Sequence, residues 1–118
     1  MKEIIFYSYS KCSTCRKASK WLDDKNLEYQ LIDIVKEPPL HKYIEISLKQ
    51  YQDNKKRIFN TRGKSFKSFD YDIDSLSKEE ITQLLLSDGK LIKRPFLVKA
   101  EKIILLGFDE TEYANQLL

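Results

Sequence analysis

The first 35 residues constrain the fold most, because they read as a strand, a helix and a second strand. Residues 4–7 form a short apolar run of β-forming residues, which is typical of a buried strand. A polar stretch from Ser8 to Thr14 follows, and the apolar residues then recur at helical spacing, namely Cys15, Ala18, Trp21 and Leu22. We expect Asn26 to end this helix and residues 29–35 to form a second strand. A β–α–β unit of this kind usually makes a parallel pair of strands.

The next part of the chain, about residues 40–89, predicts helices rather than strands. Its first half keeps apolar residues at helical spacing. Its clearest helix start lies at Ser77, because Ser77 and Glu80 have the S-x-x-E spacing of a capping box. Gly89 is expected to end that helix as the glycine just past its C-terminus. We interpret the whole stretch as a helical insert.

Strands return after the insert. Arg94 and Pro95 lead into the apolar run 96–98, and a short turn separates this run from residues 103–106, so the pair predicts an antiparallel hairpin. Asp109 repeats the capping pattern and is expected to begin the last helix. The order β–α–β, helical insert, β–β–α predicts an α/β fold of the thioredoxin-like, glutaredoxin type. Such a fold is a four-stranded mixed sheet with helices on its faces.

Length, charge and cysteine content exclude several classes of protein. The 118 residues fit one domain, which we expect to span residues 1–118. The net charge of +3, from 21 basic and 18 acidic residues, is too small to indicate nucleic-acid binding. No apolar stretch approaches the ~18 residues of a membrane span, and two cysteines cannot form a dense disulfide framework. We therefore expect a cytoplasmic monomer that binds neither nucleic acid nor a membrane.

Cys12 and Cys15 form a C-x-x-C motif between the first strand and the first helix, a context that indicates redox chemistry. Cys12 is expected at the helix N-terminus, where free N–H groups and the helix dipole stabilise an anion. Because Lys11 and Arg16 add positive charge, we expect Cys12 to be the nucleophilic thiolate. Cys15 lies one helical turn later and could attack a mixed disulfide on Cys12. Its place on the apolar face also fits an inert, buried cysteine.

A metal site and an oxyanion site are the other candidates. Zinc needs four ligands, and only His41 remains after the two cysteines, so we expect no metal. Arg62 and Arg94 could supply an oxyanion pocket, because a guanidinium presents a planar fork of donors. In a thioredoxin-type sheet Pro95 would face the cysteine loop, and a cis Arg94–Pro95 bond is compatible with that position. The alternative is that each arginine is solvated or lies in a surface ion pair.

Four segments together resemble the arsenate reductase (ArsC)/Spx family: Cys12-Ser13-Thr14-Cys15-Arg16-Lys17-Ala18, Asn60-Thr61-Arg62, Leu91-Ile92-Lys93-Arg94-Pro95-Phe96 and Gly107-Phe108. The resemblance covers almost the whole chain and implies a thioredoxin-like domain with an inserted helical subdomain in a bacterial cytoplasm. The arsenate reductases coupled to glutathione and glutaredoxin use one nucleophilic cysteine, which matches Cys12. Two of their three arginines match Arg62 and Arg94, whereas this chain has residues 106–108 where the third would lie.

The Spx branch of the family consists of transcriptional regulators that bind the RNA polymerase α subunit. Its redox switch is a C-x-x-C like that of Cys12 and Cys15, and it has an arginine that matches Arg94. The glycine that Spx uses for the polymerase contact has no counterpart before Arg62, and the Spx tail extends further than Leu118. The short arsenate reductase-like branch, which has no single established role, fits the length of this chain best.

Two functions follow from these observations. The leading one is a thiol-dependent oxidoreductase in which Cys12 attacks a disulfide or an oxyanion such as arsenate. Its substrate site would comprise Lys11, Arg62, Arg94 and Pro95. No bound cofactor is expected; glutathione, glutaredoxin, thioredoxin or Cys15 would release the adduct, the last by forming a Cys12–Cys15 disulfide. The alternative is a redox-sensing regulator that binds the RNA polymerase α subunit. A scaffold without chemistry is the third hypothesis.

Overall fold

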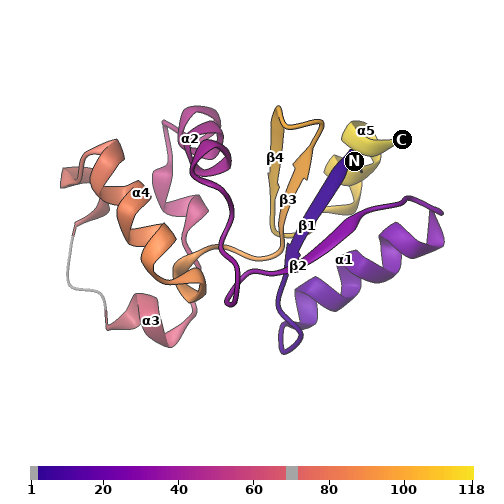
Figure 1. Cartoon of the computed structure of the whole chain (residues 1–118), viewed down its shortest axis with the longest axis horizontal. Helices are drawn as coiled ribbons and strands as arrows, with labels where there is room; N and C mark the ends of the chain where they lie inside the picture. The colour runs from indigo at the N-terminus through magenta and orange to yellow at the C-terminus, as the bar shows by residue number, and fades with distance from the viewer. Residues whose placement is uncertain (1–2, 69–71) are drawn as a thin grey trace.

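A four-stranded mixed sheet lies between two groups of helices in the computed structural model, which describes residues 3–68 and 72–118 (Figure 1). Its strands are β1 (Ile4–Ser8), β2 (Gln30–Asp33), β3 (Phe96–Lys99) and β4 (Ile103–Leu106), in the spatial order β2-β1-β3-β4. β1 runs parallel to β2 and antiparallel to β3, and β3 runs antiparallel to β4. The predicted thioredoxin-like layout is therefore confirmed.

One face of the sheet is covered by α1 (Ser13–Asp24) and α5 (Glu110–Leu117). The buried residues of α1 are the four that the helical spacing selects, Cys15, Ala18, Trp21 and Leu22. They pack with Ile4 and Phe6 of β1. Asn26 adopts a left-handed conformation with φ of 58° just after α1, and its N–H donates to the carbonyl oxygen of Asp23. The predicted stop at Asn26 is thus a left-handed C-terminal cap.

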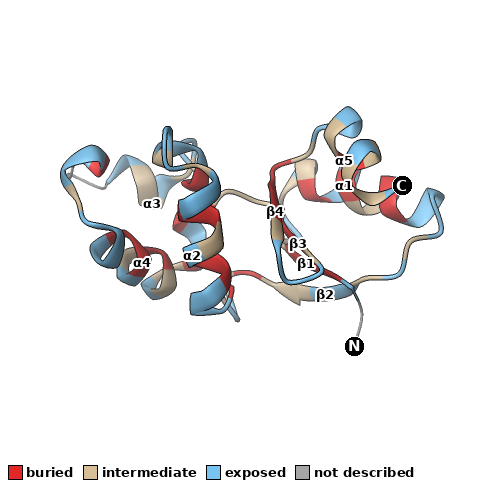
Figure 2. Ribbon diagram, turned by 90° about the horizontal axis from the view of Figure 1, so that it is seen from above, coloured by how far each residue is buried: buried red, intermediate tan, exposed pale blue. Residues whose placement is uncertain are grey.

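The opposite face of the sheet packs against the insert between β2 and β3 (Figures 1 and 2). Alternate residues of β1 divide between the two faces, so Ile5 and Tyr7 contact the insert side. The insert consists of α2 (His41–Gln50), η1 (Lys55–Ile58), α3 (Lys64–Lys67), η2 (Ile73–Ser75), α4 (Lys78–Ser87) and η3 (Gly89–Leu91). The helices that the sequence indicates over about residues 40–89 are thus present.

The start of α4 and the place of a glycine just past its end are as predicted, but the reason for the glycine differs. Ser77 and Glu80 form a complete capping box. Asp88, in an extended conformation, caps the C-terminus, and Gly89 instead begins η3. A Cβ atom at Gly89 would lie 2.1 Å from the carbonyl oxygen of Ile34. Gly89 therefore follows the C-cap residue as predicted, but it does not adopt a left-handed φ, and the close approach of two backbones is what requires a glycine there.

The C-terminal elements follow the sequence pattern. β3 and β4 are joined by the three residues 100–102, of which Ala100 and Glu101 have positive φ angles. The N–H of Lys102 donates to the carbonyl oxygen of Lys99 at 3.0 Å and closes a tight turn. The Asp109 side chain caps α5 by accepting the N–H of Glu112 at 3.0 Å. None of the helices in the described residues combines the length and the apolar character needed to cross a bilayer.

Candidate active site

Cys12 caps the N-terminus of α1 with its sulfur. It ends the polar loop that follows β1, and its own N–H donates to the carbonyl oxygen of Tyr9 at 3.0 Å. The N–H of Cys15 donates to Cys12 Sγ at 3.3 Å. The sulfur thus stands where a Ser or Asp oxygen commonly caps a helix, and Cys12 is partly exposed. The sulfur thus faces an N–H donor at the positive end of the helix dipole.

Cys15 lies in a different environment one turn further along α1. Its side chain is 1% exposed. Burial, together with the hydrogen bond to Cys12, raises the pKa of the Cys15 thiol to about 11. Cys15 therefore keeps its proton at neutral pH and can donate it toward Cys12. Both cysteines are free thiols, so the structure describes the reduced pair.

Arg94 and Pro95 approach the cysteine loop from the start of β3. The Arg94–Pro95 bond is cis. Since Phe96 pairs with Tyr7 of β1, the proline lies beside the end of β1 from which the cysteine loop departs. The Arg94 guanidinium carbon lies 4.9 Å from the centroid of the Tyr9 ring, a cation–π contact. Tyr9 therefore contacts Arg94 through its ring and Cys12 through its carbonyl oxygen.

Tyr9 is a site residue that the sequence does not indicate. It lies in the loop before Cys12, but its stacking partner is distant along the chain, so no local spacing could reveal the contact. The proximity of Arg94 to the cysteine loop, in contrast, is what the position of Pro95 in the fold implies.

Lys11 and Arg62 do not show a side-chain contact with the cysteine loop like that of Arg94 with Tyr9 among the described residues. Both side chains are exposed, and within residues 3–68 and 72–118 neither forms a side-chain hydrogen bond or ion pair. The segment before Arg62 nevertheless runs antiparallel to the segment before Arg94. Asn60 donates its N–H to Leu91 at 2.8 Å, in line with the bridge between residues 59 and 92. The two arginine-bearing segments are therefore neighbours, while among the residues that the structure describes no contact brings Arg62 to Cys12.

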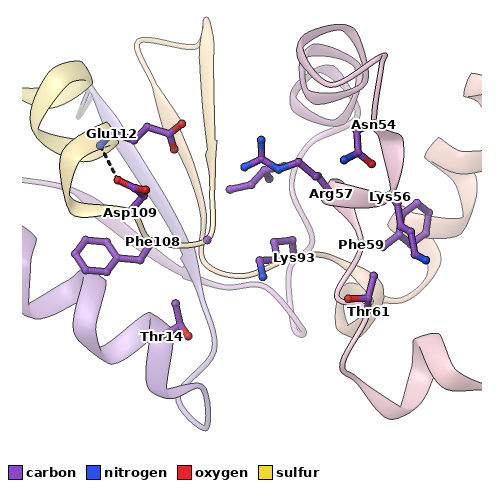
Figure 3. A pocket seen from close by; sticks show the side chains of 12 residues that line it. Thr14, Asn54, Lys56, Arg57, Phe59, Thr61, Lys93, Phe108, Asp109 and Glu112 are labelled. Atoms are coloured by element: carbon purple, nitrogen blue, oxygen red, sulfur yellow. Dashed lines mark hydrogen bonds between the residues drawn. The ribbon is translucent and has the colours of Figure 1, made fainter.

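A pocket of about 540 Å³ opens between the sheet and the insert (Figure 3). It includes Thr14 of the C-x-x-C motif, Thr61 next to Arg62, and Lys93 next to Arg94. The rest of its lining consists of Asn54, Lys56, Arg57, Phe59, Leu106, Gly107, Phe108, Asp109 and Glu112. The pocket thus lies next to the candidate residues, although Cys12, Arg62 and Arg94 do not themselves line it. Apart from Thr14, its lining draws on the insert, the segment before β3, the end of β4 and the start of α5, which local spacing cannot bring together.

His41, the third ligand weighed for a metal, lies exposed at the start of α2, where its Nδ1 contacts the Glu45 carboxylate. In the described part of the chain, no group of three or more His, Cys, Asp or Glu side chains is placed to hold a metal ion.

Comparison with known proteins gives consistent matches over the whole length of the chain. The chain is 36% identical over 112 residues to the uncharacterized protein YusI of Bacillus subtilis, and the match covers 93% of this chain and 94% of YusI. It is 30% identical over 109 residues to the global transcriptional regulator Spx of Listeria innocua, covering 92% of this chain and 82% of that protein. Relatives thus include a protein named as a regulator.

A solved structure gives the same answer at the level of the fold. The crystal structure of a protein described as a possible arsenate reductase from Streptococcus mutans is 39% identical and superposes with a TM-score of 0.83, over 98% of this chain and 99% of that one. The model of the ArsC family matches residues 7–116. The cysteine loop, the insert and the segment around Arg94 all fall inside that match. The chain therefore belongs to the ArsC family.

Proposed function

We propose that this protein is a thiol-dependent oxidoreductase whose nucleophile is Cys12. The observation that carries the proposal is the partly exposed sulfur at the N-terminus of α1, which accepts the N–H of Cys15 at 3.3 Å. A substrate can reach the sulfur at this position, beside the N–H groups and the positive dipole end of a helix start. The guanidinium of Arg94, held against Tyr9, adds positive charge at the same loop.

With a disulfide substrate, the Cys12 thiolate attacks one sulfur, forms a mixed disulfide and releases the other sulfur as a thiolate. Cys15 then loses its proton and attacks the Cys12 sulfur. This step releases the remaining half of the substrate as a thiolate and leaves a Cys12–Cys15 disulfide. Glutathione, glutaredoxin or thioredoxin reduces that disulfide by the same exchange. Because burial raises the pKa of Cys15 to about 11, we expect the second step to be the slower one at neutral pH.

With arsenate, the Cys12 thiolate would form a sulfur–arsenic bond while one arsenic–oxygen bond breaks and the oxygen leaves as water. A second thiolate would then attack the Cys12 sulfur, forming a disulfide, breaking the sulfur–arsenic bond and leaving its electron pair on arsenic as arsenite. Arg62 and Arg94 would stabilise the negative charge of the oxyanion, with Lys11 and Pro95 lining its site. In this chain residues 106–108 carry no basic group where the family's third arginine is expected. The sequence at these positions therefore favours a disulfide over arsenate as the substrate.

Turnover assays test the proposal directly. The purified protein is given a small-molecule disulfide or arsenate, with glutathione, glutaredoxin or thioredoxin as the reductant. We expect disulfide reduction that is lost in Cys12→Ser and slowed in Cys15→Ser, with Ser13→Ala as a matched control in the same motif. If no reductant supports turnover that depends on Cys12, the proposal of a thiol-dependent oxidoreductase is refuted.

A second function is favoured by one observation, the 30% identity to Spx over 92% of this chain. In this alternative the Cys12–Cys15 pair is a redox switch, and the protein binds the RNA polymerase α subunit. A pull-down with purified α subunit, using the reduced and the oxidised protein, tests it. We expect binding that differs between the two redox states, and absence of binding in both states would eliminate the regulator.

A further inference from the structure

We propose that the basic surface around Cys12 docks an acidic segment of a protein, and that this segment carries the disulfide which Cys12 attacks. This inference rests on the proposed function, because it names the class of substrate for the same thiol. A small oxyanion would engage only the groups next to the sulfur. The cations of this surface, in contrast, extend beyond the cysteine loop to two other parts of the chain.

The positive charge is concentrated in three segments, residues 10–17, 60–68 and 88–94, which together form the basic surface. They hold nine of the 21 Lys and Arg residues of the chain, but Asp88 is their only member among its 18 Asp and Glu residues. The Asp88 carboxylate accepts the backbone N–H of Lys90 at 2.9 Å. Since the net charge of the whole chain is only +3, the charge is distributed unevenly and one part of the molecule is strongly basic.

The fold brings the three segments together. Asn60 donates its N–H to the carbonyl oxygen of Leu91 at 2.8 Å, and α3 contacts η3, so the second segment lies beside the third. Arg94, at the end of the third segment, stacks on the Tyr9 ring in the cysteine loop. Figure 1 shows α3, the segment that leads into β3 and the loop before α1 along the same lower side of the molecule. The basic residues therefore surround the approach to Cys12.

The cations are accessible to a partner. Five of them are exposed outside α1, and Lys93 and Arg94 are partly exposed; the five are Lys11, Arg62, Lys64, Lys67 and Lys90. None of the ion pairs within residues 3–68 and 72–118 involves a residue of the three segments. Unpaired charges of one sign repel one another, and a partner of opposite sign relieves this repulsion. Such a field also raises the rate at which an acidic partner arrives.

The thiol within the basic surface favours a protein over a nucleic acid as the partner. A nucleic acid offers negative charge but no disulfide, whereas Cys12 is partly exposed and accessible to one. When an acidic segment docks, the Cys12 sulfur forms a bond with one sulfur of its disulfide. The original sulfur–sulfur bond breaks, and the other sulfur leaves with the electron pair as a thiolate. The basic surface thus selects the disulfide by the charge around it.

The test uses two peptides of equal length, in which one cysteine is joined through a disulfide to thionitrobenzoate, a coloured leaving group. Glutamates flank the cysteine in the acidic peptide, and glutamines flank it in the neutral peptide. At low ionic strength the acidic peptide should release the chromophore about tenfold faster. This advantage should disappear in about 1 M salt, where the Debye length is about 3 Å. Cys12→Ser measures the release that does not depend on the nucleophile.

A pair of lysine substitutions tests the surface itself. The double variant Lys64→Gln and Lys90→Gln should slow the reaction of the acidic peptide about fivefold and leave that of the neutral peptide unchanged, because only the first is attracted by charge. The matched control is Lys49→Gln with Lys102→Gln, in the last turn of α2 and in the turn between β3 and β4. It removes the same charge away from the basic surface and should change either rate by less than about twofold.

Equal rates for the acidic and neutral peptides, or equal losses in the surface variant and its control, would overturn the inference and leave the oxidoreductase intact. Tight binding of a DNA duplex at physiological salt, measured by fluorescence anisotropy, together with equal peptide rates, would assign the surface to nucleic acid and overturn it as well. If neither peptide reacts in a way that depends on Cys12, the proposed function fails, and the inference fails with it.

Discussion

At the scale of single residues, the two cysteines differ because one caps a helix and the other is buried in its apolar face. The different surroundings give a nucleophile that is partly exposed and a neighbouring thiol that holds its proton. Burial and the hydrogen bond to Cys12 raise the pKa of Cys15 from 9.0 to about 11. This shift has a consequence for stability as well as for reactivity.

The first prediction is that Cys15 makes stability fall at alkaline pH. The unfolded thiol loses its proton near pH 9, while the folded one keeps it until about pH 11, so stability is unaffected below pH 9 and declines between pH 9 and 11. Between pH 8 and 10 the wild type should lose about 1 kcal/mol more free energy of unfolding than Cys15→Ala. Urea denaturation at the two pH values measures the difference. Equal losses in both proteins would show that the Cys15 pKa is not raised.

The site could be predicted from the sequence only where the information is local. The position of Cys12 at a helix start follows from the polar loop and the helical spacing that begins at Cys15. The stacking of Arg94 on Tyr9 does not, because it depends on how β1 and β3 pair. The charged residues that line the pocket could not be predicted either, because they come from η1 and from the start of α5, which are distant in the sequence.

At the scale of elements, the close approach of η3 to the chain after β2 depends on Gly89. The second prediction is that Gly89→Ala destabilises the protein by about 2 kcal/mol or more, because the new methyl group would lie 2.1 Å from the carbonyl oxygen of Ile34. Thermal and urea unfolding measure the effect. Gly63→Ala is the matched control, since its nearest contact is the flexible Asn60 side chain. Similar losses in the two variants would contradict the steric explanation.

The edge strand β4 is paired by a side chain of α2. Gln50 donates its Nε2 to the carbonyl oxygen of Ile104 at 3.0 Å and accepts the Ile104 N–H at 2.8 Å. These two bonds resemble the pair of backbone hydrogen bonds that a neighbouring strand would make. They therefore pair backbone N–H and C=O groups that an edge strand would otherwise leave exposed.

The third prediction is therefore that Gln50→Ala lowers the free energy of unfolding by about 1–2 kcal/mol, for two lost hydrogen bonds. It should also speed hydrogen exchange of the Ile104 amide. Gln52→Ala, at an exposed position without a recorded side-chain bond, should change stability by less than about 0.5 kcal/mol. An unchanged exchange rate of the Ile104 amide would mean that its hydrogen bond to the Gln50 side chain does not protect it from solvent.

Helices could be predicted from the sequence where the spacing of a few residues within one helix determines its buried face or its start. The buried face of α1 and the capping box at Ser77 both follow from spacing within a single helix. The place of Gly89 just past α4 could be predicted, because it follows the C-cap residue Asp88, but the reason for the glycine could not. Its actual constraint comes from Ile34, which the sequence does not place beside it.

At the scale of the whole molecule, the sheet is shared by two apolar clusters. β1 contributes Ile4 and Phe6 to the cluster beneath α1 and α5, and Ile5 and Tyr7 to the cluster beneath the insert. Neither cluster can lose its packing without exposing one face of the same strands.

The fourth prediction is that the insert and the sheet unfold as one cooperative unit, as the expectation of a single domain requires. Trp21, the only tryptophan, lies in the cluster beneath α1, so its fluorescence reports on that side alone. Far-ultraviolet circular dichroism reports on the helices of both sides. We expect the two urea transitions to coincide. Separate midpoints would show two independently folding parts.

The most direct test of the central claim, that Cys12 is the nucleophile and Cys15 the resolving thiol, is mass analysis after exposure to oxidised glutathione. Cys15→Ala should accumulate one glutathione adduct, on Cys12, because the resolving thiol is absent. The wild type should instead pass through that adduct to a disulfide between Cys12 and Cys15, and Cys12→Ala should remain unmodified. An adduct that forms on Cys15, or no adduct on Cys12 in the Cys15→Ala protein, would contradict the claim.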